Sequence, residues 1–283
     1  MTTATVPVTA PSARPEQHPP GLVMSSLIVV RRNLIHIKRM PEMLLDVTVQ
    51  SVMFVLLFAY VFGGAIGVPG SDTDYKEFLV PGIMVQTMVF SSAIVAMGLT
   101  NDLQKGIVDR LKSLPVSRQS VLVGRSISSL IHSSIGIAVM GLTGLLIGWR
   151  MREGVVDGLL GVAMLLLFGF AMIWLGIWVG SLMRTVEAVQ GFMFTVMFPL
   201  TFVANTFVPS ETMPSWLRAI AEWNPVSSLT QACRELWGNG PAAPADAAWS
   251  LQHPVLMTVS WSLLLTAIFA PLAVMAFRRR SRD

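Results

Sequence analysis

The chain has 283 residues, of which 53% are hydrophobic and 13% are charged, and its formal net charge is +4. Soluble domains contain about 25% charged residues, so this composition excludes a soluble enzyme, and it is too apolar for a disordered chain. The single cysteine, Cys233, excludes an intrachain disulfide framework and a metal site built from several thiolates. The composition indicates a protein that crosses a membrane several times.

The amino-terminal region contains two different segments. Residues 1–21 are rich in Pro, Thr, Ala and Ser and lack an apolar stretch, which is typical of a disordered tail and not of a signal peptide. Residues 22–40 carry apolar side chains on one side of a helix and basic ones, including Arg39, on the other. This segment is too charged to span, so we expect an amphipathic helix on the inner membrane surface, with a simple basic anchor as the alternative.

Six stretches without Asp, Glu, Lys or Arg are long enough to cross a bilayer, because about 20 helical residues span its core. The expected spans are residues 47–66, 79–100, 126–149, 158–182, 188–207 and 254–277. They lack the polar–apolar alternation of strands. The predicted fold is therefore an all-α membrane protein with six transmembrane helices, in a single domain over residues 22–280. The fifth span is the least regular, since Pro199 and Asn205 interrupt it.

An even number of spans places both termini on the same side of the membrane. The segments on that side hold fifteen of the twenty basic residues. Because basic residues are enriched in cytoplasmic loops, we expect both termini in the cytoplasm.

The connection between the second and third spans, residues 101–118, has apolar residues at helical spacing and is interrupted by Pro115. A short cytosolic helix here would suit docking into a groove on a partner protein, and the alternative is the solvated end of a long transmembrane helix. The expected docking residues are Lys105, Ile107, Asp109, Arg110, Leu111, Lys112 and Leu114, together with Arg39 of the preceding interface helix.

The connection before the last span, residues 208–246, is cut by prolines into two helical pieces, about 215–223 and 226–237. Asn224 or Ser227 could cap the second piece. Its tryptophans suit the lipid interface, and they are Trp216, Trp223, Trp237 and Trp249. We expect a re-entrant hairpin that dips into the outer leaflet, with a plain extracellular loop as the alternative.

Sequence motifs for catalysis are missing. The chain has no phosphate-binding Gly-x-x-x-x-Gly-Lys-Ser/Thr loop, and its four histidines lack metal-ligand spacing. His132, in the third expected span, is the one ionisable side chain expected within a span, where a structural role is favoured over a functional one. Otherwise the spans offer neutral polar groups, which suits a hydrophobic or amphipathic solute moved by an external energy source. Candidate path residues are Phe54, Phe58, Gln86, Phe90, Phe194, Phe198 and Asn205, although packing or lipid contact is the alternative for most such side chains. Three glycine pairs have the spacing of a close helix contact, a weak signal because glycine is common in membrane helices: Gly63 and Gly67, Gly144 and Gly148, and Gly176 and Gly180.

This order of elements resembles the permease of type-2 ABC exporters over about residues 22–280. GIVDRLKSLPVSR (106–118) looks like the coupling region of that family, and FVPSETMPSWLRAIAEWNPVSSLTQACREL (207–236) is similar to its outer hairpin. Asn224-Pro225 followed by Arg234 is the most specific part. Residues 36–66 look close to the daunorubicin-resistance, DrrB-like permeases of actinobacteria.

The resemblance implies a drug-efflux permease of the bacterial cytoplasmic membrane, expected as a homodimer. Two copies of a separate ATPase would bind ATP and Mg, while this chain would hold no catalytic residue, cofactor or nucleic acid. The docking residues would couple to the ATPase, and the outer gate would consist of Trp216, Trp223, Asn224, Pro225 and Arg234. An anthracycline-type substrate follows from the narrower match. The alternatives are a lipid or polysaccharide exporter of the same family, a gradient-driven carrier, and a non-transporting assembly subunit.

Overall fold

The computed structural model describes residues 49, 52, 53, 55–61, 75–106, 118–244 and 246–280. All regular structure in these residues is helical, which confirms the predicted all-α class for this part of the chain. The expected tail and interface helix, residues 1–40, lie outside the described residues, as do residues 62–74 and 107–117.

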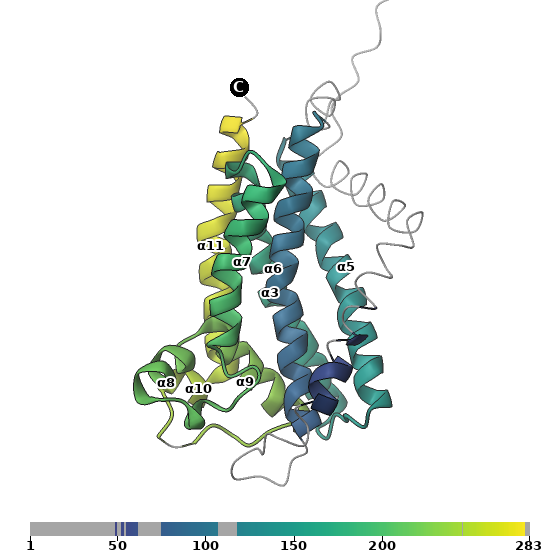
Figure 1. The fold of residues 1–283 in the computed structure, drawn as a ribbon, viewed down its shortest axis with the longest axis vertical. Helices are drawn as coiled ribbons and strands as arrows, with labels where there is room; N and C mark the ends of the chain where they lie inside the picture. The colour runs from purple at the N-terminus through teal and green to yellow at the C-terminus, as the bar shows by residue number, and fades with distance from the viewer. Residues whose placement is uncertain are drawn as a thin grey trace, which may run out of the picture.

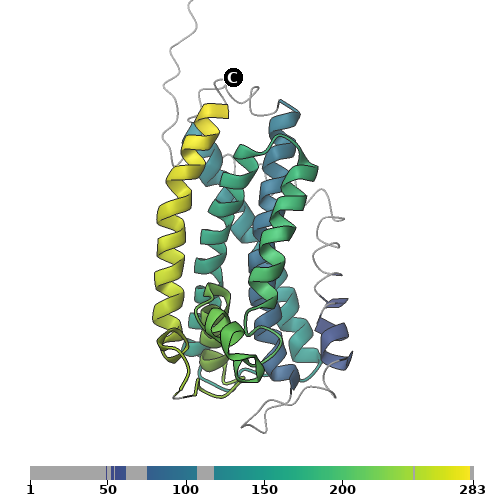
Figure 2. The same ribbon diagram turned by 60° about the vertical axis from the view of Figure 1, so that its left-hand side comes forward.

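The described residues form a bundle of long helices with short helices at one end. The long helices are α3 (Tyr75–Gln104), α5 (Arg118–Leu146), α6 (Val155–Leu182), α7 (Val186–Phe202) and α11 (Pro254–Arg280). The short ones are η1 (Ser210–Thr212), α8 (Ser215–Glu222), α9 (Pro225–Trp237) and α10 (Trp249–Gln252). Figures 1 and 2 show α8, α9 and α10 gathered at one end, here named the hairpin end, while α11 runs to the opposite, C-terminal end.

Four helical segments are long and apolar enough to cross a membrane, and they are Tyr75–Gln104, Leu122–Leu146, Val155–Leu182 and Pro254–Arg280. Helix α7 is also apolar but has 17 residues. The described residues between 49 and 61, in the first expected span, are helical as well. These helices support a multi-pass membrane protein, and the count of six spans stays a prediction.

Two described helices differ in extent from the charge-free windows. Helix α5 begins at Arg118, well before the window that starts at 126, and its Arg125 is paired with Asp102 of α3. Helix α7, in the fifth expected span over 188–207, ends at Phe202. The Asn205 and Thr206 carbonyl groups that follow it bind a side chain of α9, as described below.

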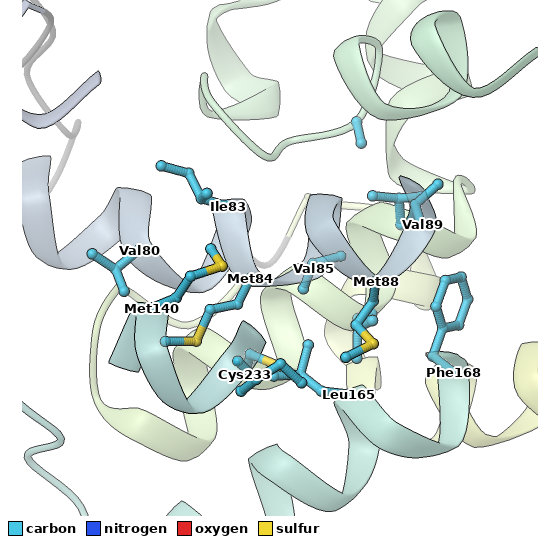
Figure 3. Packing of buried hydrophobic residues seen from close by; sticks show 14 of the residues in the cluster. Val80, Ile83, Met84, Val85, Met88, Val89, Met140, Leu165, Phe168 and Cys233 are labelled. Atoms are coloured by element: carbon cyan, nitrogen blue, oxygen red, sulfur yellow. The ribbon is translucent and has the colours of Figure 1, made fainter. Parts of the chain in front are cut away.

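Helix α3 forms the centre of the bundle and is buried on most of its surface. Figure 3 shows its Val80, Ile83, Met84, Val85, Met88 and Val89 packed among residues of three other helices. Those partners are Met140 of α5, Leu165 and Phe168 of α6, and Cys233 of α9. Burial of this apolar surface fixes the positions of the helices that carry the candidate site.

Helices α3 and α6 approach each other closely at one of the predicted glycine pairs. A Cβ atom on Gly180 would lie 2.6 Å from the carbonyl oxygen of Ala96, and one on Gly176 would collide with the carbonyl oxygen of Ser92. Small residues permit such backbone contact in membrane helices. The Thr100 hydroxyl reinforces it by donating to the Gly180 carbonyl oxygen at 2.9 Å. The predicted close contact is confirmed at Gly176 and Gly180. It is wrong at Gly148, where a Cβ atom would meet nothing within 4 Å, and Gly63 and Gly67 lie outside the described residues.

Candidate functional site

The expected gate residue Arg234 is a buried cation that joins three segments. Its side chain comes from α9 and is 1% exposed. Nε donates to the carbonyl oxygen of Phe78, Nη1 to that of Asn205 and Nη2 to that of Thr206, each at 2.9 Å. The guanidinium also lies 3.3 Å from the centroid of the Phe78 ring, a cation–π contact. Helix α9 is thereby tied to α3 and to the chain that follows α7.

Burial lowers the pKa of Arg234 to about 9, which leaves the guanidinium cationic at neutral pH. No carboxylate among the described residues forms an ion pair with this cation. Carbonyl dipoles and an aromatic face therefore stabilise the buried charge. The Asn205 and Thr206 carbonyl groups follow the end of α7 at Phe202, where the Asn205 amide donates to Ser227 Oγ.

Asn224 and Pro225 start α9 and fasten it to α7. Asn224 is the N-cap, and its Oδ1 accepts a hydrogen bond from the Val226 amide at 2.9 Å. Its Nδ2 donates to the Leu200 carbonyl oxygen at 2.7 Å, near the end of α7. Pro225 occupies the first helical turn, where its missing N–H costs nothing. Of the two expected caps, Asn224 performs this role, while Ser227 Oγ accepts from the Asn205 amide at 3.0 Å.

The tryptophans of the hairpin separate into two groups. Trp216, Trp223 and Trp249 are 66%, 52% and 48% exposed, as an interfacial role requires. The expectation is wrong for Trp237, which is fully buried. Its indole donates to the Gly158 carbonyl oxygen at 3.1 Å and meets the Trp149 ring edge to face at 5.5 Å. Its polar atom is therefore satisfied inside the protein.

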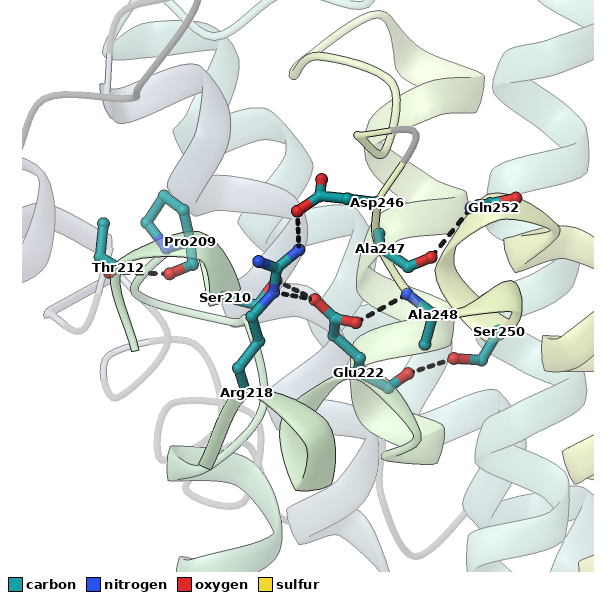
Figure 4. Close-up of polar contacts among 10 residues, drawn as sticks. All are labelled: Pro209, Ser210, Thr212, Arg218, Glu222, Asp246, Ala247, Ala248, Ser250 and Gln252. Atoms are coloured by element: carbon teal, nitrogen blue, oxygen red, sulfur yellow. Dashed lines mark hydrogen bonds and ion pairs between the residues drawn. The ribbon is translucent and has the colours of Figure 1, made fainter. Parts of the chain in front are cut away.

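A carboxylate that the sequence did not single out holds the hairpin together. Figure 4 shows Glu222 of α8 at the centre of these contacts. Its Oε1 accepts from Arg218 Nε at 2.6 Å, and its Oε2 accepts from the Ala248 amide at 2.7 Å. Arg218 also pairs with Asp246 at 3.1 Å. The Arg218–Glu222 spacing on one helix was the available sequence signal, since residues four apart lie on one face.

Four of the expected path residues belong to a continuous row of phenylalanine rings, which we call the aromatic ladder. Its members are Phe58, Phe90, Phe194, Phe198, Phe202 and Phe207, of which the sequence analysis missed the last two. Phe90 lies 5.8 Å from Phe194 and 6.4 Å from Phe198, by ring centroids. Phe198 stacks on Phe202 at 4.5 Å, and the row continues through Phe207 to Phe58.

Three of the six ladder rings lie on an open face of α7. Only Val189, Met193, Met197 and Thr201 of this helix are buried, whereas Phe194, Phe198 and Phe202 are 42%, 49% and 43% exposed. Rings at these spacings offer a row of apolar faces on which a flat solute could stack.

The remaining path residues lie apart from the ladder or outside the described part. Gln86 is buried within α3 at 5% exposure, and Asn205 is buried beside Arg234 with its Oδ1 unpartnered among the described atoms. Phe54 is outside the described residues. Sequence reasoning therefore grouped residues that the fold places in two different environments.

The expected docking residues fall mostly outside the described chain. Residues 101–104 form the end of α3, and Lys105 is exposed in the turn that follows, where Gly106 has a φ of 63°. Residues 107–114 and Arg39 lie outside the described residues. The structure thus describes only the start of this segment, and both the docking helix and its alternative stay predictions.

Comparison with known families decides what kind of membrane protein this fold represents. The model of the ABC-2 type transporter family matches residues 25–236, a range that includes α3, the aromatic ladder and the Arg234 contacts. The chain belongs to the ABC-2 type transporter family.

The relatives of this ABC-2 chain include named drug-resistance permeases. It is 32% identical over 259 residues to the "Daunorubicin resistance ABC transporter permease protein DrrB1" of Streptomyces coeruleorubidus, which covers 92% of this chain and 88% of the relative. It is 25% identical over 260 residues to the "Probable doxorubicin resistance ABC transporter permease protein DrrC" of Mycobacterium tuberculosis, covering 92% and 90%. A third relative, 22% identical over 211 residues, is the "Probable multidrug ABC transporter permease YbhR" of Escherichia coli, covering 74% and 54%.

Family membership makes the chain a membrane permease subunit of an ABC transporter, in which a separate subunit is the ATPase. Within the described residues, no group of three His, Cys, Asp or Glu side chains could hold a metal ion. The described part of the site consists of apolar surfaces, the Arg234 contacts and close helix packing.

Proposed function

We propose that this ABC-2 permease belongs to an exporter that moves hydrophobic or amphipathic drug-like compounds, of the anthracycline type, out of the cell. The names of its relatives support a drug substrate, since they refer to daunorubicin, doxorubicin and multidrug transport. The orientation proposed here places the C-terminal end of the bundle in the cytoplasm and the hairpin end outside a bacterial cytoplasmic membrane, in keeping with the distribution of basic residues.

The single observation that carries the proposal is the exposed part of the aromatic ladder on α7. Among the described residues, the side chains of Phe194, Phe198 and Phe202 keep 42%, 49% and 43% of their surface exposed. Flat polycyclic solutes stack favourably on such rings, by about 0.5–1.5 kcal/mol per aromatic pair beyond the burial of area. Because the expected spans hold no Asp, Glu, Lys or Arg with which to couple transport to an ion gradient, the energy would come from the partner ATPase.

The proposed complex contains two copies of this permease and two copies of the ATPase, which carry ATP and Mg. The ladders of the two permeases would face each other across a central path. The ATPase would dock at the cytoplasmic connection that begins at Lys105, with Arg39 of the surface helix nearby. Closure of the ATPase subunits would then be transmitted into the bundle as a movement of packed helices.

The hairpin contacts define how an outer gate would move in this mechanism. Asn224 binds the last turn of α7, and Arg234 binds the chain directly after it. Helices α8 and α9 would therefore follow any displacement of the end of α7. Opening at the hairpin end and rearrangement of the ladder would be one coordinated event.

The test is ATP-driven efflux of daunorubicin, followed by its fluorescence, in vesicles that contain the permease and its ATPase. We expect transport that vanadate inhibits, and Phe198→Ala should reduce the apparent affinity for daunorubicin by about tenfold, the equivalent of one aromatic contact. Phe192→Ala is the matched control, because Phe192 is 42% exposed on the same helix and is not a ladder member. Efflux independent of ATP would refute the exporter, and equal effects of the two variants would refute the ladder as its path.

A further inference from the structure

An ion pair joins α3 and α5 at the C-terminal end of the bundle. Arg125 Nη1 of α5 contacts Asp102 Oδ2 in the last turn of α3, and the side chains are 20% and 32% exposed. Helix α3 leaves space for this cation, since a Cβ atom on Gly98 would lie 2.5 Å from Arg125 Nη2. The contact is therefore built into the packing of the two helices and is more than a meeting of mobile surface chains.

The position of the pair along the chain is informative. Helix α3 ends at Gln104, and α5 begins at Arg118, so a single connection links them. Asp102 precedes this connection and Arg125 follows it. The ion pair thus holds the two helices together at the base of the connection to which the proposed function assigns ATPase docking.

A second set of contacts extends from the same base to α6 and α7. Gln104 Nε2 donates to the Arg184 carbonyl oxygen at 3.0 Å, and Thr100 Oγ1 donates to that of Gly180 at 2.9 Å. Arg184 lies in the short link between α6 and α7. A displacement of the end of α3 would consequently reach the beginning of α7, which carries three of the six members of the aromatic ladder.

We propose that the Asp102–Arg125 ion pair makes α3 and α5 respond as one body to movement of the connection between them, and so acts as a positioning pair for transport. This inference rests on the proposed function. Without the pair, Gly106, with its φ of 63°, would allow the connection to rotate relative to α3, and a movement of the ATPase would change the backbone there without displacing the helices. With the pair, the same movement would displace α3 and α5 together.

The test measures the distance between α3 and α5 in the complete permease–ATPase complex, without nucleotide and after vanadate trapping. Spin labels at Ile94→Cys and Ile127→Cys suit this measurement, because the two side chains are 53% and 38% exposed. Cys233 is fully buried and would remain unlabelled. Because the proposed complex contains two copies of the permease, complexes labelled at only one of the two positions are measured as well, and they give the distances between labels on different copies.

We expect one unchanged distance in the otherwise wild-type complex. Asp102→Asn and Arg125→Gln should each produce a shifted or broadened distance after trapping, and should lower the daunorubicin moved per ATP hydrolysed by about tenfold, which is about 1.4 kcal/mol. The exchange Asp102→Arg with Arg125→Asp should restore both readouts. Arg152→Gln is the control, since it breaks a 2.8 Å pair with Glu77 at the other end of α3.

Unchanged distances in both single variants would overturn the proposal. It would also be overturned if the charge exchange failed to restore the coupling ratio, because the loss would then reflect general damage to the packing. A wild-type complex without ATP-driven daunorubicin transport would refute the proposed function instead, and the distances alone would then decide for or against the pair.

Discussion

The guanidinium of Arg234 rests on the ring of Phe78, 3.3 Å from its centroid, while its Nε binds the carbonyl oxygen of the same residue. One residue of α3 thus supplies both an aromatic face and a carbonyl dipole to a cation of α9. The relationship places the most specific motif residue of the hairpin in the interior of the protein. Arg234 therefore attaches the hairpin to α3 and to the chain after α7, and the proposed outer gate would move relative to this attachment.

Replacing Arg234 by lysine tests this attachment. Lysine keeps the charge but cannot reproduce the planar set of three bonds, so buried carbonyl groups would lose their partners. We expect Arg234→Lys to lower the free energy of unfolding by about 3–5 kcal/mol, the cost of breaking a buried charge contact. Thermal unfolding in detergent, followed by tryptophan fluorescence, measures it. Arg152→Lys, at a mostly exposed side chain, should leave the midpoint unchanged, and equal midpoints for both variants would contradict the attachment.

Substitutions at Asn224 separate its two contacts. Asn224→Asp retains the cap on the Val226 amide but loses the donor to the Leu200 carbonyl, whereas Asn224→Ala loses both. We expect the alanine variant to lose about 1–2 kcal/mol for the cap alone and more for the link to α7. Hydrogen exchange should show faster exchange at the start of α9 only in the alanine variant. Equal hydrogen-exchange rates at the start of α9 in the two variants would show that the cap on the Val226 amide does not stabilise this end of the helix.

The glycines of α6 and α7 provide a matched pair of variants. Gly180→Ala places a Cβ 2.6 Å from the Ala96 carbonyl oxygen, so α3 and α6 must separate. We expect a clear loss of folded protein by size-exclusion chromatography and a lower unfolding midpoint. Gly191→Ala has no neighbouring atom within 4 Å and should gain up to about 1 kcal/mol from helix propensity. A tolerated Gly180→Ala would contradict the close contact.

Reversing the basic charges of the expected docking segment tests its role in coupling. We expect the triple variant Lys105→Glu, Arg110→Glu and Lys112→Glu to insert normally but to lose ATP-driven daunorubicin transport at least tenfold. The physical reason is loss of charge complementarity with the partner ATPase. Co-purification with the ATPase and vesicle efflux give the two readouts. Normal transport by this variant would refute docking through these charges.

Much of the helical architecture was predictable because lipid imposes a strong constraint on sequence. Long charge-free stretches identified the segments that became α3, α5, α6 and α11, and prolines identified the pieces that became α8 and α9. Helix ends were less predictable. A charge-free stretch marks only the apolar core of a helix. Helices α3 and α5 extend beyond these stretches and include Asp102 and Arg125, whose charges are paired with each other.

The site was only partly predictable, because its contacts connect positions far apart in the chain. Arg234 was singled out by its motif, but its bond to the Phe78 carbonyl spans 156 residues and leaves no local pattern. Trp237 and Trp216 share a residue type, and only the fold decides that one is buried and the other exposed. The rings of Phe202 and Phe207 completed the aromatic ladder because the chain bends between them, a bend set by Arg234.

Helix α7 contacts the rest of the described bundle mainly through a narrow line of Val189, Met193, Met197 and Thr201. The Thr201 hydroxyl donates to the Met197 carbonyl oxygen of its own helix at 2.8 Å, and the other three side chains are apolar. Thioether and alkyl groups can exchange dispersion contacts with their neighbours without breaking a strong bond. Along this line a small rotation of α7 would therefore cost little, whereas the bond from Asn224 Nδ2 to the Leu200 carbonyl oxygen holds its far end. The beginning of α7 would thus be the freer end, and its rotation would change the direction in which the phenylalanine rings face.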